Sequence, residues 1–101
     1  MNRELLPNRR RSELYDFEHE GIGFTGRVSR FADGRIAEVF LDARRPGSGI
    51  ATAARDIGVA ASLALQHGTP VETLRKALTR LNDGSAAGPL GRLLDIVEEG
   101  R

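Results

Sequence analysis

The stretch that decides the fold is GFTGRVSRFADGRIAEVFLD, residues 23–42, in which two alternating runs flank Asp33 and Gly34. Asp-Gly between runs of alternating apolar and polar residues is a strong hairpin signal, because both residues tolerate the positive φ angles of a tight turn. A two-residue loop there sets Val28 opposite Val39. The stretch therefore predicts an antiparallel hairpin, and its apolar face fixes the register.

A further strand precedes this hairpin. Residues 13–21, ELYDFEHEG, also alternate, and a turn at Glu20 and Gly21 sets Phe17 opposite Phe24. The paired apolar side chains then fall on one face of a three-stranded meander, and we expect this face to form the core. It consists of Tyr15, Phe17, Phe24, Val28, Ala37, Val39 and Leu41.

Three sizeable apolar residues, Phe31, Ile36 and Phe40, fall on the opposite face of the predicted sheet. Their neighbours on that face are polar, so we expect the face to be an interface with a second copy of the chain or with another protein. The alternative is that the N-terminal segment or the last helix covers it.

The apolar pattern becomes helical from Ile50 onward. It predicts a central, largely buried helix that ends before Gly68. Its expected buried residues are Ile50, Ala54, Ile57, Ala61, Ala64 and Leu65, widened by Val59 and Leu63. Small residues recur at every fourth position, at Ala54, Gly58 and Ser62, which allows close approach of another helix or of the sheet.

Two shorter helices are predicted after it. Thr69 is the expected N-cap and Pro70 the first residue of a helix over 70–81, with Leu81 on its buried side, and Gly88 and Pro89 open a third helix. Strands followed by helices predict an α+β fold. We expect a three-stranded antiparallel meander followed by two to three helices packed on one sheet face.

The composition limits domain organisation and chemistry. The 101 residues suffice for one domain, which we place at residues 12–101, after a flexible basic arm at residues 1–11 that carries four arginines. No apolar run approaches the roughly 20 residues of a membrane span and no secretory signal is visible, so a cytoplasmic location is expected. The formal charge is +1, and the absence of cysteine excludes disulfides and thiol chemistry.

The connection RRPGSG, residues 44–49, is the strongest candidate for a ligand site. Backbone N–H groups at a helix N-terminus, together with two arginines, favour binding of an anion such as phosphate. The candidate residues are Arg44, Arg45, Gly47, Ser48 and Gly49. The stretch lacks the lysine and following hydroxyl residue of a P-loop, and any strand-to-helix connection could use the same residues.

No other pattern indicates catalysis, a metal site or a cofactor. His19 and His67 do not have the spacing of metal ligands, and no serine has an evident base. The competing function is nucleic-acid binding through the arginine-rich arm, which would contact phosphates without sequence preference. The near-neutral charge and an aromatic content of 5% weigh against that function.

Taken in order, the motifs resemble the TSCPD domain found toward the C-terminus of adenosylcobalamin-dependent (class II) ribonucleotide reductases. The likeness covers roughly residues 12–98. The matching pieces are Asp33-Gly34-Arg35, Glu38-Val39-Phe40, Arg45-Pro46-Gly47-Ser48, Ser62-Leu63-Ala64-Leu65 and His67-Gly68-Thr69-Pro70.

The resemblance implies a stand-alone accessory or binding module linked to deoxyribonucleotide or DNA metabolism, through a phosphate-bearing ligand or a reductase-type protein partner. The departures from the family concern chemistry. The reductases use radical and dithiol cysteines, whereas this chain has none and also lacks the Thr-Ser-Cys-Pro-Asp string. Arg45 stands where the family usually has lysine. We therefore expect no enzyme activity from this chain alone.

Overall fold

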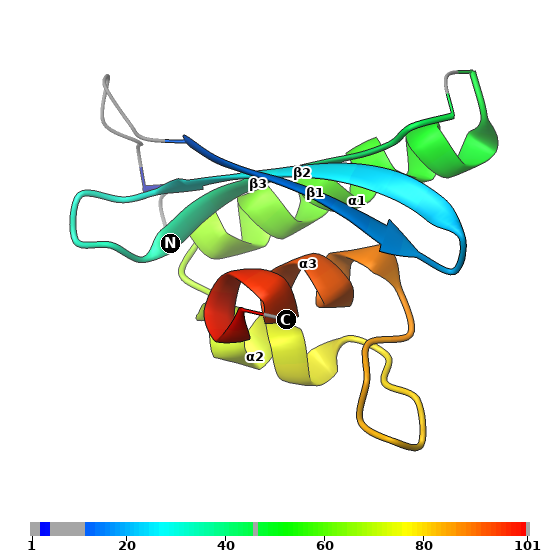
Figure 1. Ribbon diagram of the computed structural model, residues 1–101. Helices are drawn as coiled ribbons and strands as arrows, with labels where there is room; N and C mark the ends of the chain where they lie inside the picture. The colour runs from blue at the N-terminus through cyan, green and yellow to red at the C-terminus, as the bar shows by residue number, and fades with distance from the viewer. Residues whose placement is uncertain (1–2, 5–11, 46, 101) are drawn as a thin grey trace.

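The computed structural model describes residues 3–4, 12–45 and 47–100. Its elements are β1 (Ser12–His19), β2 (Ile22–Arg30), β3 (Ile36–Ala43), α1 (Gly49–Gln66), α2 (Val71–Ala77) and α3 (Pro89–Glu99). The sheet forms one layer, with α2 and α3 on one side of it, as Figure 1 shows. The α+β prediction is confirmed. Most of the predicted arm, residues 1–11, and Pro46 lie outside the described residues.

The sheet is the predicted meander, with strand order β1-β2-β3 and antiparallel pairing throughout. The predicted pairs are present: Phe17 lies opposite Phe24, and Val28 lies opposite Val39. The first turn also forms as expected, with positive φ angles of 52° at Glu20 and 77° at Gly21. The register prediction is therefore confirmed at both interfaces between strands.

The second hairpin differs from the prediction at its loop. The N–H of Phe31 donates to the carbonyl of Arg35, so the loop has three residues, and Gly34 supplies the positive φ of 95°. Next to the loop, Arg30 pairs with Ile36, one residue away from the predicted register. An irregularity between Ser29 and Arg30 then restores the predicted register, so that Ser29 pairs with Glu38. This extra residue turns Ile36 to the core face, where it is 3% exposed.

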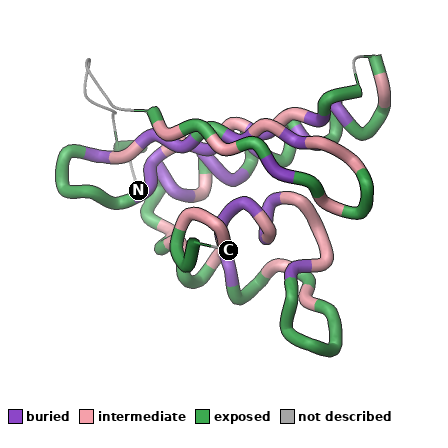
Figure 2. The backbone as a smooth tube through the Cα atoms, in the orientation of Figure 1, coloured by how far each residue is buried: buried purple, intermediate pink, exposed green. Residues whose placement is uncertain are grey.

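The core lies between the sheet and the helices. Its side chains come from the predicted sheet face and from α3, whose Leu93 and Leu94 are fully buried. Figure 2 shows buried positions along the sheet and along α3 in purple. Leu93 packs directly on the backbone of Gly26, where an added Cβ would lie 2.6 Å from its Cδ1. A glycine in β2 thus allows α3 to approach the sheet closely.

Helix α1 covers the outer edge of β3 with its small and polar residues. Ser62 Oγ accepts from the Val39 N–H at 2.9 Å and donates to the Val39 carbonyl at 3.0 Å. Gln66 Nε2 donates to the carbonyl of Ala37 at 3.0 Å. Gly58 lies so close that an added Cβ would be 3.0 Å from the Val39 oxygen. The helix therefore supplies the hydrogen bonds that a fourth strand would otherwise make.

This docking corrects the predicted buried side of the helix. The bulky residues expected inside are 39% to 60% exposed, namely Ile50, Ile57, Val59 and Leu63. Ala54, Ala61 and Leu65 are buried as predicted. Close packing on the backbone of a strand requires small side chains. The helix therefore turns its small residues, and not its bulky apolar ones, toward β3.

Helix α2 is shorter than the predicted 70–81 and ends at Ala77. Leu78 is extended, and residues 79–87 form a loop held by a bridge between Arg80 and Ala86. Leu81, predicted to be buried, is 52% exposed. Thr69 is not the cap residue either, because Pro70 occupies that position without a side-chain hydrogen bond.

An ion-pair network joins α2, this loop and α3. The buried guanidinium of Arg75 contacts Asp95 at 2.9 Å and also pairs with Glu72 and Glu99. Arg80 binds the same Asp95 carboxylate. Hydrogen bonds from Arg80 and Arg75 hold the pKa of Asp95 below its usual value, although burial acts in the opposite direction. The network links the three segments that follow α1.

Candidate functional site

The predicted ligand turn lies between β3 and α1. Gly47 has a φ of 77°, which favours glycine, and Ser48 is the N-cap of α1. The Ser48 hydroxyl accepts from the Ala51 N–H at 3.2 Å and donates to the Arg45 carbonyl at 2.6 Å. Both functions of this hydroxyl are therefore used to hold the turn and to begin the helix.

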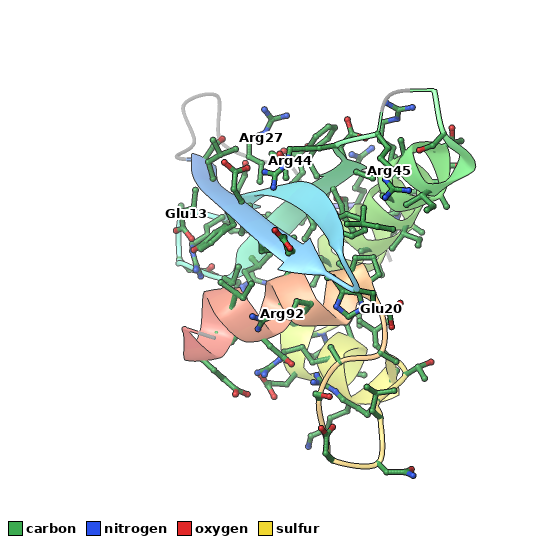
Figure 3. The ribbon with its side chains drawn as sticks, turned by 45° about the vertical axis from the view of Figure 1, so that its right-hand side comes forward. Glu13, Glu20, Arg27, Arg44, Arg45 and Arg92 are labelled. Carbon is green, nitrogen blue, oxygen red and sulfur yellow. The ribbon has the colours of Figure 1, made fainter. Side chains whose placement is uncertain are left out.

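The side chains of Arg44 and Arg45 lie in different environments. Arg44 Nη1 lies 3.1 Å from Asp16 Oδ1, and its guanidinium packs against Gly23. Arg45 is exposed, and its side chain has no ion pair within the described part of the chain. Figure 3 shows Arg27 and Arg44 on the sheet side opposite α3, with Arg45 further along, near the start of α1. Arg45 is thus the arginine available to an added anion.

The first turn of α1 leaves two backbone donors without helical partners. Gly49 and Ile50 occupy the first two positions of an 18-residue helix, where an N–H group has no carbonyl four residues earlier within the helix. The side-chain cap uses only the Ala51 N–H. An added Cβ on Gly49 would meet nothing within 4 Å, so this backbone is accessible. The turn therefore brings together Arg45 and the N–H groups of Gly49 and Ile50.

A second surface is the sheet face opposite α3, which we call the outer face. A groove of about 780 Å³ runs between this face and α1. Arg27 covers the half-buried ring of Phe40, with its guanidinium carbon 4.9 Å from the ring centre. Exposed Val59 and Leu63 form the opposite wall. The groove therefore combines arginine with apolar surface.

Carboxylates neutralise much of the positive charge near this face. Arg44 pairs with Asp16, and Arg55 lies 3.6 Å from Asp42 Oδ2. The other oxygen of Asp42, Oδ1, is buried and has no hydrogen-bond partner among the described residues. A polyanion approaching the outer face would meet acids as well as arginines, so the face does not have the uniform positive charge typical of nucleic-acid surfaces.

Two of the three predicted interface residues are buried. Placing Phe31 and Ile36 on an exposed face was wrong, because both are buried, at 6% and 3% exposed. The bulge turns Ile36 inward, and the Arg35 guanidinium covers Phe31 at 4.7 Å. Phe40 lies on the outer face as predicted. Its interface role stays a prediction.

The groove was missed at the sequence level. The predicted register contained one signal for it, because that register already places Arg27 directly opposite Phe40 on the outer face. The exposure of Val59 and Leu63 could not be predicted, because it follows from the rotation of α1.

The two histidines contact backbone carbonyls of other segments or of their own helix. Among the described residues, no group of three or more His, Asp or Glu side chains is arranged to hold a metal ion. His19 instead contacts the Ala87 carbonyl at 3.0 Å, and His67 contacts the Leu63 carbonyl at 2.8 Å. In the part of the chain that is described, no helix is long and apolar enough to cross a membrane.

Comparison with known proteins identifies relatives over most of the chain. Residues 8–97 match the family model of the TSCPD domain. The vitamin B12-dependent ribonucleotide reductase of Agrobacterium fabrum is 36% identical over 77 residues, which are 76% of this chain but 6% of that protein. The enzyme of the same name from Rhodopirellula baltica is 36% identical over 75 residues, 71% of this chain and 7% of that protein.

The chain thus corresponds to a small part of these relatives. A third relative of the same name, from Bradyrhizobium diazoefficiens, is 30% identical over 77 residues. No solved structure matches the chain. The family match includes the strands, the turn and all three helices, and on this ground the chain belongs to the TSCPD domain family.

Proposed function

We propose that this chain is a non-catalytic accessory module of deoxyribonucleotide metabolism that binds a phosphate-bearing ligand at residues 44–49. The kinship with ribonucleotide reductases supports the metabolic setting. The observation that carries the ligand class is the turn itself, where exposed Arg45 precedes two backbone N–H groups without helical partners at the start of α1. Such donors, with the positive end of a long helix, favour phosphate.

Within this proposal each predicted site residue has a distinct part. Arg45 and the N–H groups of Gly49 and Ile50 bind the phosphate. Gly47 and Ser48 shape the turn, because one has a positive φ and the other uses its hydroxyl for the cap. Arg44 borders the turn, and Asp16 balances much of its charge. A chain without cysteine contributes binding and leaves thiol-based reduction to another protein.

The test is an amide NMR titration of the labelled chain with ATP and with a deoxynucleoside triphosphate at moderate salt. We expect saturable shifts confined to residues 45–51. Arg45→Ala should weaken binding about five-fold or more, since a charge-assisted hydrogen bond contributes at least about 1 kcal/mol. The matched control is Arg55→Ala, which removes another exposed arginine of the same end of α1 and should leave the affinity unchanged.

Two results would contradict the proposal. Amide signals of residues 45–51 that stay unchanged at millimolar nucleotide would show that the turn only connects β3 to α1. Duplex DNA that binds with an affinity falling steeply with salt, with shifts spread over many arginines, would instead support the alternative of nucleic-acid binding.

A further inference from the structure

The two edges of the sheet differ in how their backbone hydrogen-bonding groups are covered. The outer edge of β3 is covered by α1, through Ser62 and Gln66. The outer edge of β1 has no such cover within the described residues, where no hydrogen bond reaches the backbone of Ser12–His19 from outside the sheet. An eight-residue edge of this kind can pair with another extended chain.

The pairing pattern shows which backbone groups point outward. The carbonyl of Gly23 accepts from the Arg44 N–H, so Gly23 faces β3 and its neighbour Phe24 faces β1. In an antiparallel ladder the N–H and C=O of one residue point the same way, and successive residues alternate. Phe17, opposite Phe24, therefore faces β2. Leu14, Asp16 and Glu18 consequently direct their N–H and C=O groups to the open edge.

Acidic side chains accompany these outward groups. Asp16 and Glu18 extend from the outer face of β1, and Glu20 follows in the turn with its side chain 72% exposed. Glu13 is not part of this row, because Arg30 pairs with it at 2.9 Å and lowers its pKa. Arg44 and Thr25 share Asp16, whereas Glu18 has no ion pair within the described residues.

The charges also disfavour a second copy of this strand. Two β1 strands paired antiparallel through their outward groups would place Asp16 opposite Asp16 in the centred register, and Leu14 opposite Glu18. Like charges directly opposite each other destabilise a strand pair. A basic strand avoids this repulsion and gains an opposite-charge pair at Glu18, whereas Asp16 already has Arg44 as a partner.

We propose that the open edge of β1 binds an extended segment of a partner protein that carries lysine or arginine at alternate positions. The segment adds a fourth strand, and its main chain pairs with Leu14, Asp16 and Glu18. Its basic side chains lie beside Asp16 and Glu18 on the outer face, and the aliphatic stem of a third lies over Leu14, which is 65% exposed. This surface meets the turn at residues 44–49 through the ion pair of Asp16 and Arg44, and the inference does not depend on the proposed function.

The probe is a synthetic eight-residue peptide of alternating lysine and valine, titrated into the full-length labelled chain. We expect saturable amide shifts at Leu14, Asp16 and Glu18, with slowed hydrogen exchange of those amides. Glu18→Lys should weaken binding about five-fold, because it replaces an attraction by a repulsion, each about 0.5 kcal/mol. A glutamate-valine peptide and a lysine-valine peptide with N-methylated alternate amides are the controls, and both should fail to bind.

A backbone variant tests the geometry independently. Leu14→Pro removes an outward N–H without breaking a bond to β2, so the chain should still fold and should lose peptide binding. Leu14→Ala keeps the N–H and should retain most of the affinity. The proposal is overturned if both control peptides bind as well as the probe. It is also overturned if Leu14→Pro, shown by its NMR spectrum to be folded, binds the probe as the unchanged chain does, or if the probe shifts residues outside β1 only.

Discussion

The contact between α1 and the edge of β3 leads to a sharp prediction about stability. In Ser62→Ala, the Val39 N–H and C=O groups lose the hydroxyl that binds both of them, at 2.9 Å and 3.0 Å. Ser62 is 8% exposed and Val39 is 3% exposed, so water has little access to replace it. Both backbone groups of the edge strand would be left buried and unpaired.

The magnitude follows from these two groups. An unpaired buried polar group costs about 1–3 kcal/mol, which gives about 2–6 kcal/mol for the pair. Alanine has a higher helix propensity than serine, which offsets this loss by about 0.5 kcal/mol. We expect the free energy of unfolding to fall by about 1.5–5.5 kcal/mol. This is a large fraction of the total stability of a domain of this size.

Urea denaturation measures the change, with Thr52→Ala as the matched control. Thr52 lies on the same helix but is exposed, so its variant should differ from the unchanged chain by less than about 0.5 kcal/mol. Amide hydrogen exchange gives a local readout, since the Val39 amide should lose protection beyond the global change. A loss in Ser62→Ala no larger than in the control, with Val39 still protected, would refute the reasoning.

Two further predictions concern the same packing and the ion-pair network. Gly58→Ala should lower the free energy of unfolding by about 1–2 kcal/mol, because its Cβ would lie 3.0 Å from the Val39 oxygen. This loss is expected although alanine has a better helix propensity than glycine. Gly49→Ala is the control in the same urea assay and should be neutral within about 0.5 kcal/mol, because open space surrounds Gly49. A stabilised Gly58→Ala would contradict the described contact. Asp95→Asn should cost about 2–3 kcal/mol at pH 7, because Arg75 keeps only Glu72 and Glu99 as partners. The folded pKa of Asp95 lies below its unfolded value, so its contribution is complete above about pH 4 and is lost as pH falls through the folded pKa. The difference between the two proteins should therefore shrink toward pH 2, and a difference independent of pH would exclude the carboxylate as its origin.

Much of the fold could be predicted from local pattern. The period-two alternation of the strands and the turn at Glu20 and Gly21 specify the meander, since slipping by one residue would turn every apolar side chain to water. Pro89 after Gly88 marks the start of α3 for a similarly local reason, because proline is favoured in the first turn. The family resemblance rested on the same motifs, and the family match confirms it.

The candidate site was only partly predictable. The turn between β3 and α1 forms where expected, but that the Ser48 hydroxyl is used in the helix cap and that Arg44 reaches Asp16 became evident only from the folded chain. The prediction that Ile36 lies on the outer face was wrong because it assumed a two-residue loop. One extra residue at a hairpin loop turns the side chains next to it to the opposite face of the sheet. The presence of that extra residue could not be predicted from the alternating pattern of the strands.

The sequence by itself determined the order, type and register of the strands and the beginnings of the long helices, because these depend on side chains a few residues apart. Only the tertiary structure decided which side of α1 is buried. The predicted apolar side of that helix carries Ile50 and Ile57, yet the strand edge beside it needs hydrogen bonds and close approach, which Gly58, Ser62 and Gln66 supply. The strand residues that set this requirement lie about 20 to 30 residues earlier in the chain, so the local pattern of the helix cannot predict it.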